Sequence, residues 1–232
     1  MNLSRFYRVS AIVLAAQVAV GLYGLWVVGP DAQVPVHWGV DGTPNGWASA
    51  LVGFSIMPLI TAGIVALFAA IPRIEPRRRN LERSANAYRT TATAVVLFLG
   101  VAQVVVVFAS LGNSLPMTGV IGLGIGLLFV VMGNVLSTVR SNFMFGVRTP
   151  WTLTSDLAWD RTNRLVGRLF VLAGISLIAL TVFGNPELIV WVMVAWIVVI
   201  VATGFAYSYR VWKTDPNQRT RSADDLEPER AR

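Results

Sequence analysis

Arginine, asparagine, threonine and tryptophan side chains are concentrated between residues 140 and 168. Guanidinium groups beside Asn and Thr are good ligands for phosphate or carboxylate. Indole rings stack on arginine or hold a loop at a membrane interface. The density of Gly, Pro, Trp and Arg favours a binding site here, and the alternative is a fixed, lipid-facing loop whose arginines reach the headgroups. The arginines of this segment are Arg140, Arg148, Arg161 and Arg164, with Arg168 at its edge.

We predict that the ligand of this inner segment is a lipid headgroup, a soluble protein partner or the N-terminal half of the chain itself. Asn134 precedes the segment, and its amide either bonds a neighbouring helix or takes part in the site. The candidate binding residues are Asn134, Arg140, Asn142, Gly146, Arg148, Thr149, Pro150, Trp151, Thr152, Trp159 and Asn163.

A second polar region, residues 29–49, holds the single histidine, His37, together with Asp31 and Asp41. One His and two Asp could suggest acid–base or metal chemistry, but their spacing matches no standard zinc site. We therefore expect no catalytic residue, no metal and no cofactor, and an enzyme is the less favoured reading.

The same region has the pattern of a short strand and a tight turn, because apolar residues alternate from Val34 to Val40. Asp41-Gly42 and Asn45-Gly46 are both turn dipeptides. The candidate residues of this outer loop are His37, Trp38, Asp41, Gly42, Gly46 and Trp47.

The elements that position both regions are membrane helices. Hydrophobic residues make up 55% of the chain and charged residues only 13%, against about 25% charged in soluble domains. Six apolar runs are long enough to cross a bilayer. They are residues 9–28, 51–71, 92–111, 117–136, 166–183 and 188–207. The first run exceeds the apolar core of a signal peptide, so we expect it to be retained as a span.

The charges fix an orientation for these spans. With an N-terminus in the cytoplasm, all 19 Lys and Arg residues fall on the cytoplasmic side. The opposite side then carries Asp31, Asp41, Glu187 and His37. The positive-inside rule thus predicts an all-α integral membrane protein, a six-helix bundle with both termini cytoplasmic.

We expect one membrane domain, residues 1–212, followed by a disordered tail, residues 213–232. Its N-terminal half is residues 1–89 with the outer loop, and its C-terminal half is residues 90–212 with the inner motif at 133–168. Ser155 is a plausible N-cap, so we predict a helix that starts near Asp156 and runs into the fifth span. The stretch through Gly146 and Pro150 is predicted to be a turn or re-entrant loop.

Several function classes are disfavoured by composition. The chain has no cysteine, which excludes disulfides and thiolate chemistry. The apolar runs contain no acidic residue, which argues against proton-coupled transport. The net charge of +7 follows the membrane orientation, so we expect no direct nucleic-acid partner.

The run Gly146-Val147-Arg148-Thr149-Pro150-Trp151-Thr152-Leu153, with Gly133-Asn134 and Arg140-Ser141-Asn142 before it and Trp159, Asn163 and Gly167 after it, resembles the signature of the SdpI-type immunity family. The outer loop from Pro35 to Trp47 resembles the uncharacterised domain that often precedes this signature. One departure is that family members often have Pro-Lys where this chain has Ser137-Thr138.

The resemblance implies a multi-pass protein of the bacterial cell membrane that protects against a secreted antimicrobial peptide of the sporulation-delaying-protein type. It also implies a signalling receptor that holds a small soluble repressor at the membrane. Two other classes stay open: an enzyme or carrier that grips a lipid headgroup with the inner arginines, and a structural membrane protein without a ligand.

Overall fold

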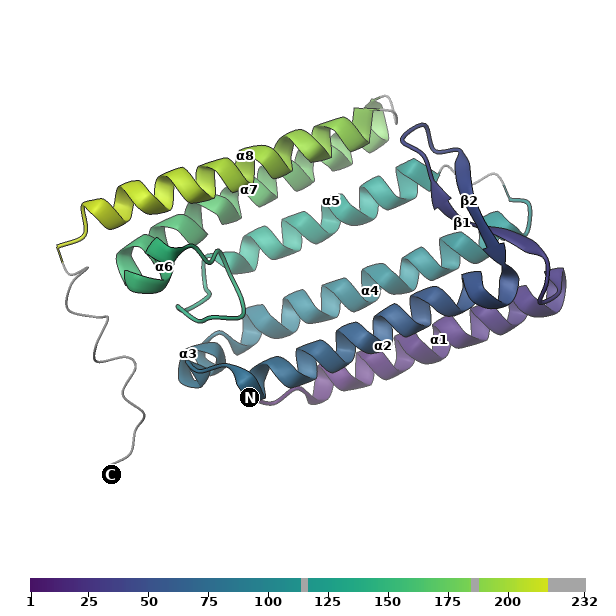
Figure 1. Cartoon of the computed structure of the whole chain (residues 1–232), viewed down its shortest axis with the longest axis horizontal. Helices are drawn as coiled ribbons and strands as arrows, with labels where there is room; N and C mark the ends of the chain where they lie inside the picture. The colour runs from purple at the N-terminus through teal and green to yellow at the C-terminus, as the bar shows by residue number, and fades with distance from the viewer. Residues whose placement is uncertain (114–116, 185–187, 217–232) are drawn as a thin grey trace.

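Six long helices dominate the structure, a computed structural model that describes residues 1–113, 117–184 and 188–216. Each is long and apolar enough to cross a membrane, which confirms the six predicted spans. Figure 1 shows that successive long helices run in opposite directions. The six are α1 (Ser4–Val28), α2 (Ala50–Ile74), α4 (Ala85–Ser110), α5 (Met117–Leu136), α7 (Asp156–Phe183) and α8 (Leu188–Lys213).

Four short elements lie at the two ends of this bundle. The helices α3 (Arg78–Arg83) and α6 (Pro150–Thr154) lie at the end where α1 begins and α8 ends (Figure 1). The strands β1 (Gln33–Trp38) and β2 (Pro44–Ser49) cover the opposite end. The expected all-α fold is thus mostly helical, with one small antiparallel sheet. We call the two ends the α3/α6 end and the hairpin end.

All the long helices except α5 extend beyond their predicted apolar runs at the α3/α6 end. For example, α1 begins at Ser4 instead of residue 9, and α8 continues to Lys213. A helix leaves the hydrocarbon region without penalty because its backbone groups remain paired. The predicted start of α7 is confirmed: the Ser155 hydroxyl accepts a hydrogen bond of 3.0 Å from the amide of Ala158.

The bundle consists of two groups of three helices. The first group is α1, α2 and α4, and the second is α5, α7 and α8, with contacts between α4 and α5 joining them. Within the first group, the buried Gln17 amide donates to the Thr61 hydroxyl and to the Leu99 carbonyl, both at 3.0 Å. These bonds tie three helices together in a region without water.

Glycine residues hold α5 against α7 in the second group. A Cβ atom added to Gly133 would lie 2.5 Å from the Gly167 carbonyl oxygen, and one added to Gly174 would lie 2.4 Å from the Gly126 carbonyl oxygen. Only glycine permits such an approach of two backbones. The α5–α7 pair is therefore the closest packed part of the second group.

The hairpin confirms the predicted strand and corrects one of the two predicted turns. The tight turn spans Gly39 to Thr43, where the Gly39 amide donates to the Thr43 carbonyl at 2.8 Å. Asn45 and Gly46 instead lie within β2, and Gly46 pairs with His37. The turn from Gly39 to Thr43 already reverses the chain direction. The Asn45-Gly46 dipeptide therefore forms part of β2, which pairs with β1.

The hairpin contacts both helix groups. The Val34 side chain lies over Gly53 of α2, where an added Cβ would be 2.6 Å from a Val34 methyl carbon. The turn reaches α5, because a Cβ on Gly42 would lie 2.5 Å from the Thr118 hydroxyl oxygen. The hairpin therefore bridges the two groups at one end of the bundle.

Two predictions concern residues that lie partly or wholly outside the described ranges. Glu187, predicted for the outer side, is not described. Of the predicted tail, only residues 213–216 are described. There Asp215 is buried, and its carboxylate accepts a hydrogen bond from the Ser155 hydroxyl.

Candidate functional site

The loop after α5 is built around the side chain of Asn142. This residue is fully buried. Its amide nitrogen donates to the carbonyls of Arg140 and Phe145, both at 2.8 Å. Its amide oxygen accepts from the backbone nitrogens of Met144 at 2.9 Å and Phe145 at 2.6 Å. A single amide thus replaces the backbone pairing that regular structure would supply.

Thr149 and Thr152 begin the short helix α6. The Thr149 hydroxyl accepts from the Thr152 amide at 3.2 Å, and the Thr152 hydroxyl accepts from the Thr149 amide at 2.8 Å. This reciprocal arrangement is a capping box, and Pro150 occupies the first helical turn, where no amide hydrogen is needed. The Thr149 hydroxyl also donates to Ser208 on α8 at 3.0 Å. The predicted turn therefore contains one short helix, fixed to α8.

Trp159 and Asn163 hold the loop to α7. The buried indole nitrogen of Trp159 donates to the Val139 carbonyl at 2.6 Å, and the Asn163 amide oxygen accepts from the Val147 amide at 2.9 Å. Gly146 lies between them with φ of 118°, and a Cβ there would lie 2.9 Å from the Trp159 ring. A residue other than glycine would be strained both in its backbone and against the indole.

Five of the predicted binding residues are thus buried and bonded within the chain: Asn142, Thr149, Thr152, Trp159 and Asn163. Their polar groups shape the loop. One of the three partners predicted for this segment is the N-terminal half of the chain. The structure shows the contacts between that half and the loop directly.

The N-terminal half grips this loop through residues that the sequence analysis did not single out. The Glu75 side chain is only 4% exposed. Its carboxylate accepts from the amide of Phe143 at 3.1 Å and from the amide of Arg77 at 2.8 Å. The Arg77 guanidinium donates to Ser141 and to the Leu153 carbonyl, and lies 4.7 Å from the centre of the Phe143 ring.

Two further bonds complete this grip. The Asn80 amide donates to the Ser141 carbonyl at 2.8 Å, and the Ser84 hydroxyl accepts from the Arg140 amide at 2.8 Å. We call Glu75, Arg77, Asn80 and Ser84 the inner clamp. The sequence analysis missed the inner clamp because the arginines of residues 73–89 were already explained by the orientation of the spans. An acidic residue beside Pro76 within that basic loop was the one available signal.

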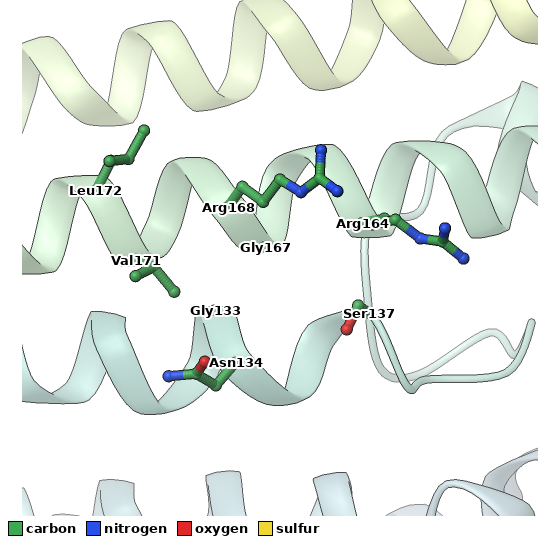
Figure 2. Close-up of a pocket in the computed structure, with 8 residues that line it drawn as sticks. All are labelled: Gly133, Asn134, Ser137, Arg164, Gly167, Arg168, Val171 and Leu172. Carbon is green, nitrogen blue, oxygen red and sulfur yellow. The ribbon is translucent and has the colours of Figure 1, made fainter.

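The structure separates the arginines that the sequence placed in one cluster. Arg140 lines a polar hollow of about 300 Å³. The Arg148 guanidinium is exposed and donates to the Phe143 carbonyl at 2.7 Å. Arg164 lines a different groove with Arg168 (Figure 2). The hollow of Arg140 is otherwise lined by Asn80, Arg83, Ser141, Asp156 and Asp160.

Asn134 belongs to the groove of Arg164. Its amide is exposed and bonds only the Val130 carbonyl of its own helix among the described residues, at 2.9 Å. It therefore does not join neighbouring helices, which was one of its two expected roles. Trp151 is half-buried, and the centre of its ring lies 5.2 Å from that of Tyr209 on α8.

The hairpin end holds an apolar cavity of about 320 Å³ beneath β1. Of the outer-loop candidates, His37 and Trp38 line it, whereas Trp47 is 57% exposed. The His37 ring nitrogen Nδ1 lies 2.5 Å from the Asn45 amide oxygen. The rest of the lining is nearly all apolar: Val36, Gly39, Met57, Ala102, Val106, Thr118, Ile121, Gly122, Ile125, Ile189, Val190 and Met193.

Asp41 remains charged at the hairpin turn. The hydroxyl of Thr43 donates to its carboxylate at 2.8 and 2.9 Å, and the Thr43 amide donates at 3.1 Å. These bonds hold the pKa of Asp41 below its ordinary value. Within the described part of the chain, no three His, Asp or Glu side chains come together as metal ligands would.

Comparison with known proteins agrees with this arrangement of two halves. Residues 138–209 match the model of the SdpI/YfhL protein family. The second half of this chain is thus similar to the SdpI/YfhL family over most of its length. Residues 12–62 match a domain of unknown function, DUF1648, which spans α1, the hairpin and the start of α2. Both resemblances inferred from the sequence are thereby confirmed.

The SdpI/YfhL match contains the loop, α6, α7 and most of α8. A curated relative, Immunity protein SdpI from Bacillus subtilis (strain 168), is 29% identical over 181 residues, which cover 78% of this chain and 84% of the relative. No solved structure matches the chain significantly.

Proposed function

We propose that this protein protects a bacterial cell membrane against an antimicrobial peptide that arrives at the hairpin end. The proposal rests on the similarity to Immunity protein SdpI over most of both chains. The described Lys and Arg side chains belong to the segments at the α3/α6 end, so the positive-inside rule assigns that end to the cytoplasm. The hairpin then faces outward.

The apolar cavity beneath β1 is the observation that carries the proposal. Its volume of about 320 Å³ matches one or two large apolar side chains. The hairpin, α2, α4, α5 and α8 all contribute to its wall, so it lies where the two helix groups meet. A membrane-active peptide must carry apolar side chains, and burial of these side chains here would remove them from the bilayer.

The charge of the hairpin end supports a peptide with positive charge. Asp31 and the ionised Asp41 are exposed there, and the described residues of this end include no Lys or Arg. A surface of one sign raises the rate at which ligands of the opposite sign arrive. Charge would therefore guide the peptide, and the cavity would hold it.

Survival of a sensitive host tests the proposal. The host expresses the parent protein, Ala102→Leu or Ala66→Leu, and is challenged with a peptide toxin of the sporulation-delaying-protein type. Ala102 lines the cavity and is buried, so leucine there fills part of it. Ala66 is exposed on α2, so the same change there serves as the control.

We expect the parent and Ala66→Leu to protect, and Ala102→Leu to protect less at equal abundance in the membrane. Absence of protection by the parent would remove the immunity function. Equal protection by the parent and both variants would show that the cavity takes no part in protection.

Signalling to a soluble repressor is a second candidate, favoured by the polar hollow of Arg140. Two arginines and two aspartates line it, at the end that we assign to the cytoplasm. A mixed charge pattern of this kind suits specific recognition by a soluble protein. Substitution Asp160→Lys is expected to abolish repressor retention at the membrane while protection persists, and joint loss of both would count against a separate signalling surface.

A further inference from the structure

An open groove runs along one side of the α5–α7 pair, near the α3/α6 end. Its volume is about 720 Å³. The groove exists because Gly133 and Gly167 bring the two backbones into contact and contribute no side chain of their own to its floor. Figure 2 shows its lining, which is Gly133, Asn134, Ser137, Arg164, Gly167, Arg168, Val171 and Leu172.

Two arginines line this groove without a partner from the described chain. Arg164 and Arg168 are exposed, lie one helical turn apart on α7, and make no hydrogen bond or ion pair with any described residue. Like charges at this spacing repel each other. The arrangement costs stability unless an anion lies between or beside the two guanidinium groups.

The groove is polar at one end and apolar at the other. Arg164 and Ser137 lie toward the loop after α5, and Val171 and Leu172 lie toward the middle of the helices (Figure 2). A ligand that fills it must therefore carry an anionic group at one end and an apolar group at the other. A free phosphate or a soluble sugar phosphate would leave the apolar end empty.

We propose that this groove binds an anionic phospholipid, with the phosphate held by Arg164 and Arg168 and an acyl chain along Val171 and Leu172. This site is separate from the cavity at the hairpin end and does not depend on the immunity function. A guanidinium group can donate two parallel hydrogen bonds to the oxygens of one phosphate. The Ser137 hydroxyl and the Asn134 amide are the further polar groups on the wall.

The position in the bilayer and the absence of acids favour this class of lipid. Arginines near the end of a membrane helix reach the headgroup layer, where lipid phosphate is the most abundant anion. None of the residues that line the groove is Asp or Glu. A choline or ethanolamine ammonium would therefore meet two positive charges and no carboxylate, whereas an anionic headgroup meets only complementary charge.

Lipid binding by the purified full chain tests this proposal. The protein in neutral detergent is titrated with phosphatidylglycerol or phosphatidylcholine, and bound lipid is counted by native mass spectrometry. The test variant is Arg164→Gln/Arg168→Gln. The control variant, Arg5→Gln/Arg8→Gln, removes two exposed arginines from α1. They lie at the same end of the bundle as the groove but do not line it.

We expect the parent and the α1 variant to retain phosphatidylglycerol in preference to phosphatidylcholine. The groove variant is expected to bind phosphatidylglycerol about 25-fold more weakly, because each arginine near a charged headgroup contributes about fivefold. Equal weakening in both variants, or full binding by the groove variant, would overturn the proposal.

Two further arms keep the test decisive if the groove variant folds poorly. Arg164→Lys/Arg168→Lys retains the charges but not the paired geometry of guanidinium, so we expect binding between that of the parent and that of the Gln variant. In the second arm, inorganic phosphate at millimolar concentration is added to the lipid-loaded parent. Retention of the lipid supports the proposal, and displacement would show that the site takes phosphate alone.

Discussion

The carboxylate of Glu75 accepts a hydrogen bond from the backbone amide of Phe143, 68 positions further along the chain. Glu75 directly follows α2 of the first helix group, and Phe143 lies in the loop that begins the segment similar to the SdpI/YfhL family. A buried carboxylate costs free energy unless hydrogen bonds compensate for lost water. This bond is therefore part of what fixes the loop, and with it the two halves of the protein, in one arrangement.

Substitution Glu75→Ala is expected to lower the free energy of unfolding by about 2–3 kcal/mol, because buried amides lose a charged acceptor. The control is Glu82→Ala. The side chain of Glu82 is 41% exposed and paired with Arg78, so its loss is expected to destabilise the protein much less. Denaturant unfolding in detergent micelles measures both, and equal effects would contradict the role of the inner clamp.

A glycine in the loop gives a second prediction. Gly146→Ala is expected to reduce stability by about 1–3 kcal/mol, because φ of 118° and the Trp159 ring both oppose a Cβ atom. Gly63→Ala is the comparison, since a Cβ at Gly63 meets nothing within 4 Å. That helix position is expected to lose no stability. A thermal unfolding series that ranks Gly63→Ala as the worse variant would count against this loop geometry.

The orientation of the bundle is tested by labelling. The chain has no cysteine, so each introduced cysteine is the only thiol present. Val40 is exposed in the hairpin, and Lys213 is exposed at the end of α8. On intact cells, a membrane-impermeant maleimide is expected to label Val40→Cys and not Lys213→Cys. The reverse pattern would invert the assignment of sides.

The hairpin turn should respond to pH through Asp41. Since the folded pKa is lowered by Thr43, the stabilisation is present above the ordinary carboxyl pKa of about 4 and is lost as the pH falls below it. A fluorophore on Val40→Cys is expected to change its signal as the pH falls below about 4. Asp41→Asn should remove that change, and persistence of the change would assign it to another group.

Much of this architecture is readable from the sequence, because membrane helices are determined by local composition. Runs of about 20 apolar residues predict the six spans, and the distribution of arginines predicts an even number of crossings. Ser155 signals the start of α7 by its own side chain, and the alternation from Val34 signals β1. The Arg148–Leu153 run was sufficient for the family resemblance.

The rest depends on contacts between distant segments, which composition does not encode. The inner clamp joins residues 56 to 76 positions apart, and no local pattern predicts that Glu75 meets Phe143. Arg140 and Arg164 line different hollows because tertiary packing, and not sequence distance, decides their neighbours. Asn45-Gly46 was assigned to a turn because the dipeptide has the right residues, whereas pairing with β1 decided its place.

Contact between a toxic peptide and the hairpin end is the most direct test of the proposed immunity mechanism. A photoreactive amino acid replaces Trp38, which lines the cavity, or Trp26, which is 82% exposed on α1 and does not line it. Cells that carry either protein receive a biotinylated toxin of the sporulation-delaying-protein type, and light is applied. We predict a cross-linked product from position 38 and none from position 26. No product at position 38, or equal yields from both positions, would contradict capture of the peptide beneath the hairpin.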